Sequence, residues 1–338
     1  MVDILQKLIN AVSVSGSEEG VSKIIEGLIE GYADTIRTDA LGNLIALKKS
    51  GLPDAKKIMI ASHMDEIGFI VTFIEETGFI RVAPVGWINW AAASFGEVLF
   101  KNGLRGVLVP ESKIYPNDYS AQNMYIDIGA KDGDDAGKKI KIGDMCTVAP
   151  KIVELINNRI AASKLDDKIA CAILIKTLQN FKNIKPPYDL YFVFTAQEEL
   201  GLRGALTAAQ AIGPDYSIAV DVTATGDTPE CHPMALKIGA GAAIKIMDSS
   251  VICHKDMVNL FLKTAAEKNI PHQSEILTQG GTDTSAMQAA GAGSVAGALS
   301  VPTRYIHSGV ELCSINDVTA CADLLYASLE NIINLRTA

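Results

Sequence analysis

Short apolar runs, each ending at a polar tip, are distributed along the chain. The run at 190–195 consists of bulky apolar and aromatic residues and is typical of a strand buried on both faces of a mainly parallel sheet. Runs at 56–61 and 216–222 predict two similar strands, and 237–246 and 295–299 predict further ones. These runs predict that the chain is built around an α/β domain.

Segments with helical periodicity surround these runs. Residues 2–10 predict an opening helix, and Ser17 is placed to cap a second helix that extends to Ile29. Residues 255–268 predict a later helix, and 317–335 predict the closing one. Helices are therefore expected at both ends of the chain.

The pattern changes between residues 69 and 159, where short β-type runs are separated by glycine, asparagine or proline turns. This texture predicts a small β-barrel inserted into the α/β domain, packed beside the functional site without forming part of it. The predicted fold class is α/β, a mixed-sheet catalytic core with an inserted β-barrel. The core comprises 1–68 and 160–338, and the insert comprises 69–159.

Composition narrows the possible partners. The net charge is −9 and the pI is near 5.1, which argues against nucleic acid or an anionic membrane surface as a partner. The N-terminal segment resembles neither a signal peptide nor a transmembrane span, so we expect a cytoplasmic protein. The six cysteines show no CxxC pairing, and this favours reduced thiols over a structural zinc site.

Two adjacent glutamates, Glu198 and Glu199, follow the apolar run 190–195 and precede a glycine-rich turn. Ligands bind at the carboxyl ends of strands in open α/β sheets, so both side chains are candidates for a functional site. One acid can hold a metal ion while its neighbour transfers a proton. Alternatively, the pair is an acidic helix N-terminus that complements the helix dipole.

His63 and Asp65 stand at the tip of the strand predicted at 56–61. In a His-x-Asp segment the aspartate can accept a hydrogen bond from the imidazole and fix its tautomer for metal binding. The alternative is a histidine that caps a turn.

Further candidate ligands follow along the chain. Asp166 and Asp167 begin a predicted helix at the domain junction, where they either line a cleft or merely cap the helix. Asp221 lies near a strand end, and His307 lies in a loop after the last apolar run. Because buried unpaired carboxylates are costly, several converging on one edge indicate a cation between them.

Taken together, these oxygen and nitrogen donors lack thiolates. They suit a pair of zinc or cobalt ions that share one aspartate, with Glu198 left free to act as a base. In the loop QGGTDTSAM, Thr282 or Asp283 is expected either to cap a helix or to contact substrate.

The ordered segments HMDE, LDD, QEELG, DVT and RYIHS resemble the dinuclear metallo-aminopeptidases of metallopeptidase family forty-two. That family includes glutamyl, leucyl and tetrahedral (TET) aminopeptidases. The resemblance extends over nearly the whole chain, from SVSGSE through YIDIGAKDG to RYIHSGVE. It implies a metallopeptidase core, two divalent metal ions, peptide substrates, and a homo-oligomer that is usually a dodecamer.

The resemblance also implies residue roles. The ligands of the two ions would be His63, Asp166, Glu199, Asp221 and His307. Asp166 would bridge the ions, Glu198 would be the general base, and Asp65 would orient His63. The choice of Asp166 over Asp167 rests on the resemblance alone. Lys168 departs from the arginine common in the family, and this departure concerns substrate preference more than chemistry.

The implied reaction is removal of N-terminal residues from peptides. Metal ions would polarise the scissile carbonyl and activate a water, whose proton Glu198 would pass to the leaving amine. An endoglucanase-like glycoside hydrolase is one alternative, but it requires two carboxyls roughly 5 to 10 Å apart and leaves both histidines unexplained. A non-catalytic peptide-binding protein is the other, and the presence of every proposed ligand and of a base argues against it.

Overall fold

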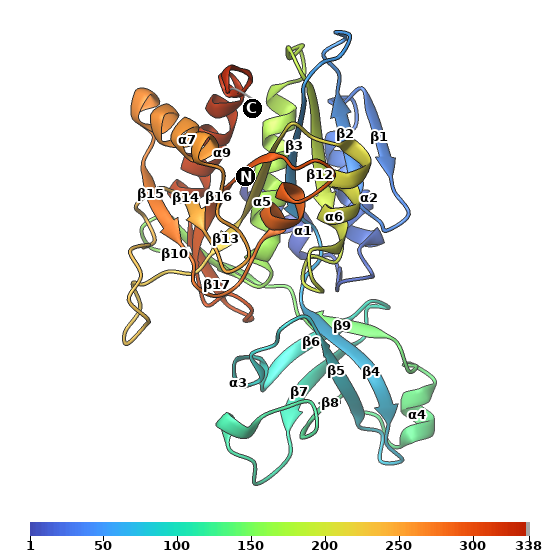
Figure 1. Ribbon diagram of the computed structural model, residues 1–338. Coiled ribbons are helices and arrows are strands. Elements are labelled where there is room, and N and C mark those ends of the chain that lie inside the picture. Colours follow the sequence, from blue (N-terminus) through green and yellow to red (C-terminus); the bar gives the residue numbers. More distant parts are fainter. Residues whose placement is uncertain (336–338) are drawn as a thin grey trace.

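The computed structural model describes residues 1–335 as a large mixed sheet with helices on both faces and a smaller closed barrel (Figure 1). The helices, including two short 3-10 turns η1 and η2, are α1 (Val2–Ile9), α2 (Glu19–Ile29), α3 (Trp90–Ala93), η1 (Pro116–Asp118), α4 (Gly133–Gly137), α5 (Leu165–Asn180), α6 (Arg203–Ile212), α7 (Lys255–Lys268), α8 (Asp283–Gln288), α9 (Ile315–Leu329) and η2 (Ile332–Asn334). The strands of the large sheet are β1 (Thr35–Thr38), β2 (Leu44–Lys48), β3 (Lys57–His63), β10 (Ile152–Leu155), β11 (Arg159–Ala162), β12 (Asp189–Thr195), β13 (Tyr216–Thr223), β14 (Ala242–Met247), β15 (His272–Ile276), β16 (Val295–Arg304) and β17 (Glu311–Ser314).

The centre of the 11-stranded sheet consists of four parallel strands in the order β12, β3, β13 and β16. The register places Thr195 opposite His63 and Asp221 opposite Ser300. Side chains at or just beyond these strand ends therefore meet at one edge of the sheet. This edge is where the sequence predicted a functional site.

Helices cover the two faces of the sheet unequally. One face packs against α1, α2, α5, α7 and α9, and this layer forms the largest hydrophobic core. The other face packs against α6 and α8, whose small alanine side chains let these helices approach the strands closely. Burial on both faces explains why the central strands lack alternating polar residues.

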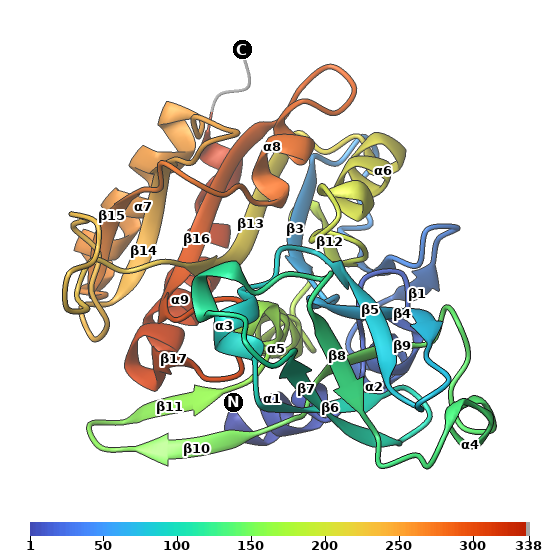
Figure 2. The ribbon, with the colours of Figure 1, turned by 90° about the horizontal axis from the view of Figure 1, so that it is seen from below.

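Six antiparallel strands form the closed barrel: β4 (Gly68–Ile74), β5 (Ile80–Val85), β6 (Gly96–Phe100), β7 (Arg105–Pro110), β8 (Met124–Asp127) and β9 (Met145–Val148). The barrel follows β3 directly along the chain (Figure 2). It has a separate hydrophobic core. The predicted fold class, an α/β core with an inserted barrel, is therefore confirmed. The predicted insert, 69–159, extends past the last barrel strand and includes β10, which pairs with β11 in the large sheet.

Two predicted helix caps differ from the structure. Residue Glu18 precedes α2 without a side-chain cap, and the Ser17 hydroxyl instead accepts a hydrogen bond from Lys101 Nζ at 2.7 Å. Thr282 precedes α8, but its hydroxyl contacts Asp248 at 3.2 Å and does not cap the helix. In both cases a partner distant in sequence competes successfully with the local backbone. Among residues 1–335, no helix is long and apolar enough to cross a membrane.

Candidate metal centre

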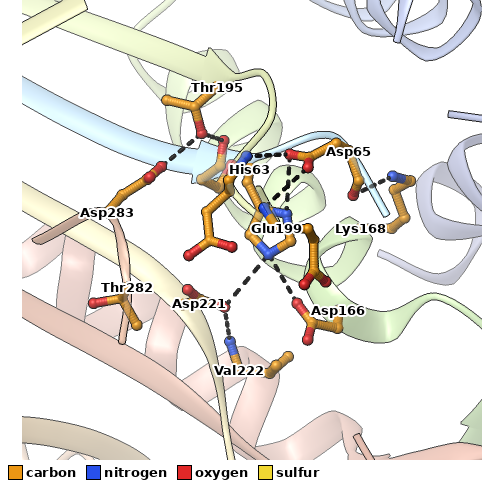
Figure 3. A network of polar contacts seen from close by, with 12 residues as sticks. His63, Asp65, Asp166, Lys168, Thr195, Glu199, Asp221, Val222, Thr282 and Asp283 are labelled. Atoms are coloured by element: carbon orange, nitrogen blue, oxygen red, sulfur yellow. Dashed lines mark hydrogen bonds and ion pairs between the residues drawn. The ribbon is translucent and has the colours of Figure 1, made fainter. Parts of the chain in front are cut away.

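His63 is the last residue of β3 and is 2% exposed. Its two ring nitrogens face different carboxylates: Nε2 lies 2.8 Å from Asp166 Oδ1, and Nδ1 lies 3.4 Å from Asp65 Oδ1 (Figure 3). Burial lowers the pKa of His63, but the charge of Glu198 and the hydrogen bond to Asp166 raise it well above its ordinary value. The ring is thus fixed in orientation by acids on both sides.

Asp65 connects three segments of the chain. Beyond its approach to His63, its carboxylate accepts hydrogen bonds from the Ser15 hydroxyl at 2.6 Å and from the backbone N–H groups of Glu198 at 3.0 Å and Glu199 at 3.2 Å. The sequence predicted only the contact with His63. Asp65 therefore sets the position of both glutamates as well as that of the imidazole.

Lys168 holds the backbone of the same loop. Its buried ammonium donates to the carbonyl oxygens of Met64 and, at 3.0 Å, of Asp65. A charged donor bound to two carbonyls fixes the peptide that leads from His63 to Asp65. Lys168, which stands where arginine is common in the family it resembles, thus lies beside the site and does not line the cavity.

Glu198 and Glu199 follow β12 in a loop whose two ends are held by the side chain of Asn43. Asn43 accepts from the Ala196 N–H at 2.9 Å and donates to the Gly204 carbonyl at 3.0 Å. A Cβ at Gly204 would lie 2.2 Å from Asn43 Oδ1 and 2.4 Å from the Ala196 carbonyl oxygen, so only glycine fits there. This close packing of α6 on the loop turns both glutamates toward the sheet edge.

The two glutamates have different partners. Glu199 Oε1 lies 3.1 Å from His307 Nε2. The Glu198 carboxylate has no hydrogen-bond partner within the described part of the chain and lines the cavity at the sheet edge. Burial raises the pKa of Glu198 well above its ordinary value; the charge of His63 lowers it, and that of Asp221 raises it.

Asp166 and Asp167 interrupt the start of α5 with non-helical backbone angles, so their side chains diverge. Asp166 contacts both histidines, with Oδ1 2.8 Å from His63 Nε2 and Oδ2 3.2 Å from His307 Nε2. Burial raises the pKa of Asp166, but hydrogen bonds from His307 and His63 outweigh it and hold the pKa low. Asp167 is fully buried, and neither of its carboxylate oxygens has a hydrogen-bond partner among residues 1–335.

Asp221 lies near the end of β13, with Oδ1 3.9 Å from His63 Nε2. It accepts a hydrogen bond from the Val222 N–H at 2.7 Å (Figure 3). Burial raises the pKa of Asp221 well above its ordinary value, although the charge of His63 lowers it. The strand-end aspartate predicted from the sequence thus faces the same histidine as Asp166.

His307 lies in the loop between β16 and β17 and has a positive φ of 62°. Its N–H donates to Glu311 Oε1 at 2.8 Å, while Glu311 Oε2 accepts from the Asp166 N–H at 2.9 Å. Burial lowers the pKa of His307, but the hydrogen bonds that its ring donates to Asp166 and Glu199 raise the pKa to about 11. Burial raises the pKa of Glu311 to about 8, and the charge of Asp166 adds to that increase.

Sequence reasoning missed Glu311 and the full role of Asp283. Glu311 joins the backbones of two candidate ligands, and its only signal is its place four residues after His307. Asp283 was expected to cap a helix or contact substrate, but it accepts from the Thr195 hydroxyl at 2.6 Å at the end of β12 (Figure 3). Burial raises the pKa of Asp283 to about 6.

The structure brings all the predicted ligands and the predicted base together. A cavity of about 530 Å³ at the sheet edge is lined by His63, Asp166, Glu198, Glu199, Asp221 and His307. The barrel also reaches this cavity. Trp87 lines it with a ring centred 5.7 Å from that of His307, so the expectation that the insert lies beside the site without forming part of it is wrong.

The donor set fits divalent cations. Two groups of three residues could each hold a metal ion, and within each group the ligand atoms lie within 4.8 Å of one another. One group is His63, Asp166 and Glu199, and the other is His63, Asp167 and Asp221. Buried carboxylates outnumber the histidines. Burying the unpartnered oxygens of Asp167 costs further free energy, which a bound cation would offset. Imidazole and carboxylate donors suit zinc and similar metals.

Comparison with solved structures assigns the class of protein. Aminopeptidase APDkam598 from the archaeon Desulfurococcus kamchatkensis is 32% identical, with a TM-score of 0.92 over 98% of this chain and 94% of that one. The TET1 peptidase of Pyrococcus horikoshii is 30% identical, with a TM-score of 0.86 over 96% of this chain and 98% of that one. The fold is that of these aminopeptidases, which are hydrolases of peptide bonds.

Sequence comparison narrows the class to a family. The sequence model described as M42 glutamyl aminopeptidase matches residues 42–324. The lysyl aminopeptidase of Pyrococcus furiosus is 31% identical over 347 residues, which cover 98% of each protein. The chain belongs to the M42 aminopeptidase family, as its resemblance predicted, and membership implies the use of divalent metal.

Proposed function

We propose that this protein is a dinuclear metallo-aminopeptidase that removes N-terminal residues from peptides, with Glu198 as general base. One observation carries the proposal. The two oxygens of Asp166 contact different histidines, at 2.8 Å to His63 and 3.2 Å to His307, as expected of a carboxylate that bridges two metal ions. This contact also supports Asp166 over Asp167 as the shared ligand.

The proposed ligands fall into two sets with Asp166 in common. His63 and Asp221 complete one set, and Glu199 and His307 complete the other. Zinc or cobalt ions held there would polarise the scissile carbonyl and lower the pKa of a water molecule. Five mixed donors exceed the three or four protein ligands that one catalytic ion takes, so two ions are proposed.

Glu198 is the group best placed to move the proton. Its carboxylate lines the cavity, is not engaged by any other side chain of residues 1–335, and has a raised pKa. In the proposed mechanism it takes a proton from the attacking water and delivers it to the amine nitrogen of the leaving peptide as the C–N bond breaks. Asp65 holds the Glu198 backbone in place through its N–H.

The glycoside hydrolase alternative is not favoured. Such an enzyme places two carboxyls across a sugar and has no use for histidine contacts at both ends of one aspartate. A non-catalytic peptide-binding role leaves unexplained why the half-buried Glu198 carboxylate lines the cavity without a hydrogen-bond partner among residues 1–335.

We also propose that the chain forms a homo-oligomer, with a dodecamer as the specific expectation, and acts in the cytoplasm. The supporting observation is the similarity to TET1 peptidase, which can assemble into a tetrahedron or a large octahedral shell. Light scattering of the purified protein tests the assembly, and a monomeric mass would contradict it.

Paired substitutions test the two glutamate roles. Glu198→Gln preserves size but removes the basic carboxylate, so we expect kcat to fall by about a hundredfold to ten-thousandfold with metal content unchanged. Glu199→Gln should instead weaken metal binding, because an amide oxygen is a poorer ligand than a carboxylate. Metal analysis beside initial rates separates them; metal loss in the Glu198 variant alone would reverse the assignments.

A further inference from the structure

We infer that the cavity selects peptides whose N-terminal residue has an apolar side chain, such as leucine, methionine or phenylalanine. The inference rests on the proposed function, because it concerns which residue that reaction removes. It is carried by the part of the cavity lining that does not belong to the candidate ligands, to which distant segments of the chain contribute apolar side chains.

Five apolar side chains larger than alanine line that cavity within the described residues. They come from the loop after β12, the end of β13, the loop after β15, the loop after β16 and the barrel: Leu202, Val222, Leu277, Ile306 and Trp87. Apart from the candidate ligands and Glu198, the rest of the lining consists of Ala224, glycines and neutral polar groups such as Ser249 and Gln279. An apolar side chain would exchange water for these surfaces, and burial of apolar area favours binding.

An acidic N-terminal side chain has no partner in this cavity. Within the described residues, no lysine or arginine lines it, and every acid that does belongs to the proposed ligands or is Glu198. A substrate carboxylate would therefore be desolvated beside Glu198, Glu199 and Asp221 without a compensating cation. A lysine side chain extending toward Ser249 and Gln279 would likewise find no acid there.

One buried lysine, Lys245, lies next to the loop of Ser249 and Ser250 and is held in ion pairs. Lys245 is 0% exposed and forms ion pairs with Glu275 and, at 3.8 Å, with Asp248. Asp248 in turn accepts hydrogen bonds from Ser250 at 2.8 Å and from Thr282 at 3.2 Å. This buried cluster fixes the two loops that form the neutral wall, and its cation is not available to a substrate.

A glycine allows those loops to meet closely. A Cβ at Gly281 would lie 2.7 Å from Ser250 Oγ, so a larger residue would push the loops apart. Trp87, which the barrel contributes to the cavity lining, is 65% exposed and offers an aromatic surface there. The cavity thus has an apolar cover and a neutral wall, both suited to an uncharged side chain.

A substrate panel tests the inference. The purified metal-loaded protein is assayed for kcat/KM on leucyl, methionyl, phenylalanyl, glutamyl and lysyl p-nitroanilides. We expect each apolar substrate to exceed the glutamyl and lysyl ones by about tenfold or more. Highest activity on the glutamyl or lysyl substrate would overturn the inference while leaving the proposed function intact. Absence of turnover on all substrates and on peptides would overturn the proposed function itself.

Charge placed in the wall gives a second test. Leu277→Arg should raise the ratio of glutamyl to leucyl kcat/KM by about tenfold, since it supplies the missing cation. Leu277→Met is the matched control and should preserve the original order. An unchanged ratio in a folded Leu277→Arg protein would show that this wall does not face the substrate, and the inference would fail.

Binding gives a readout independent of turnover and of the folding of the Leu277 variant. Metal-loaded Glu198→Gln protein should bind a short peptide with N-terminal leucine at least about tenfold more tightly than the same peptide with N-terminal glutamate, measured by calorimetry. Equal affinity for the two peptides would count against selection by the wall.

Discussion

The two halves of the candidate metal centre are built in different ways. The inner half (His63 and Asp221) lies at the ends of β3 and β13, with Asp167 of α5 beside it, and is almost fully buried. The outer half (Glu199 and His307) lies on loops, and the His307 side chain is 20% exposed and approached by Trp87 of the barrel. Asp166 lies between them.

This difference shows what each half depends on. Parallel strands fix the inner half through the sheet itself, because neighbouring strands place their carboxyl ends together. The residues of the outer half do not lie on the strands of the sheet. Their loops are held by two buried carboxylates: Asp65 accepts from the Glu199 N–H, and Glu311 accepts from the His307 N–H. Local substitutions should therefore affect the two halves differently.

Removing each histidine gives the largest expected effects. His63→Ala and His307→Ala should each lose one metal ion of two and most of the activity, measured by metal analysis and initial rates. Only His63→Ala should also destabilise the metal-free fold, by about 3 kcal/mol, because it leaves buried carboxylates without their partner. Denaturant unfolding in EDTA measures that cost; equal unfolding free energies for the two variants would contradict the distinction between inner and outer halves.

Glu311→Gln should have a smaller effect, confined to the link between the shared and outer ligands. Each Glu311 oxygen accepts one backbone N–H, so a glutamine would point its own N–H₂ at one of these donors. We expect metal affinity to fall by about tenfold to a hundredfold, as for other partners of ligands. Competition with a chelator measures the change.

Glu66→Gln is the matched control for that prediction. Glu66 is also a buried glutamate near the site, but it binds the Ser13 N–H at 2.7 Å and pairs with Lys164 at 3.3 Å rather than binding the candidate ligands. Its substitution should lower stability without changing metal affinity. Equal loss of metal affinity in both variants would mean that Glu311 acts through general stability.

Sequence reasoning reached the inner half because strand ends are visible in the hydrophobic pattern. His63 follows an apolar run and Asp221 lies near the end of another, and the parallel arrangement alone brings them together. The choice between Asp166 and Asp167 was not accessible in this way, since it depends on non-helical backbone angles at two adjacent residues. Only the family resemblance favoured Asp166.

The connections of the outer half were hidden for a different reason. Asp65 and Glu199 are 134 residues apart, and Glu311 is 145 residues from the shared ligand Asp166, so no local pattern signals these hydrogen bonds. The contribution of the barrel was hidden as well. Trp87 follows the strand β5 in an ordinary turn, and its place over the cavity depends on how the barrel packs against the loop of Glu199.

Trp87 gives the smallest predicted effect and the most direct test of how the barrel takes part. Gly86 packs closely against the loop of Glu199, since a Cβ at Gly86 would lie 3.3 Å from Glu199 Cβ. This close packing keeps the neighbouring Trp87 beside His307. Because Trp87 offers exposed aromatic surface and no chemistry, Trp87→Ala should raise KM by about tenfold and leave kcat nearly unchanged. Trp87→Phe should restore most of the loss.

Trp90 is the matched control, because it lies three residues further along but packs against Phe69 of the barrel core, with ring centroids 5.5 Å apart. Trp90→Phe should lower barrel stability while KM stays near its original value. If Trp87→Ala instead lowered kcat with KM unchanged, Trp87 would act by positioning His307, and the barrel would contribute to the chemistry of the outer half rather than to substrate binding.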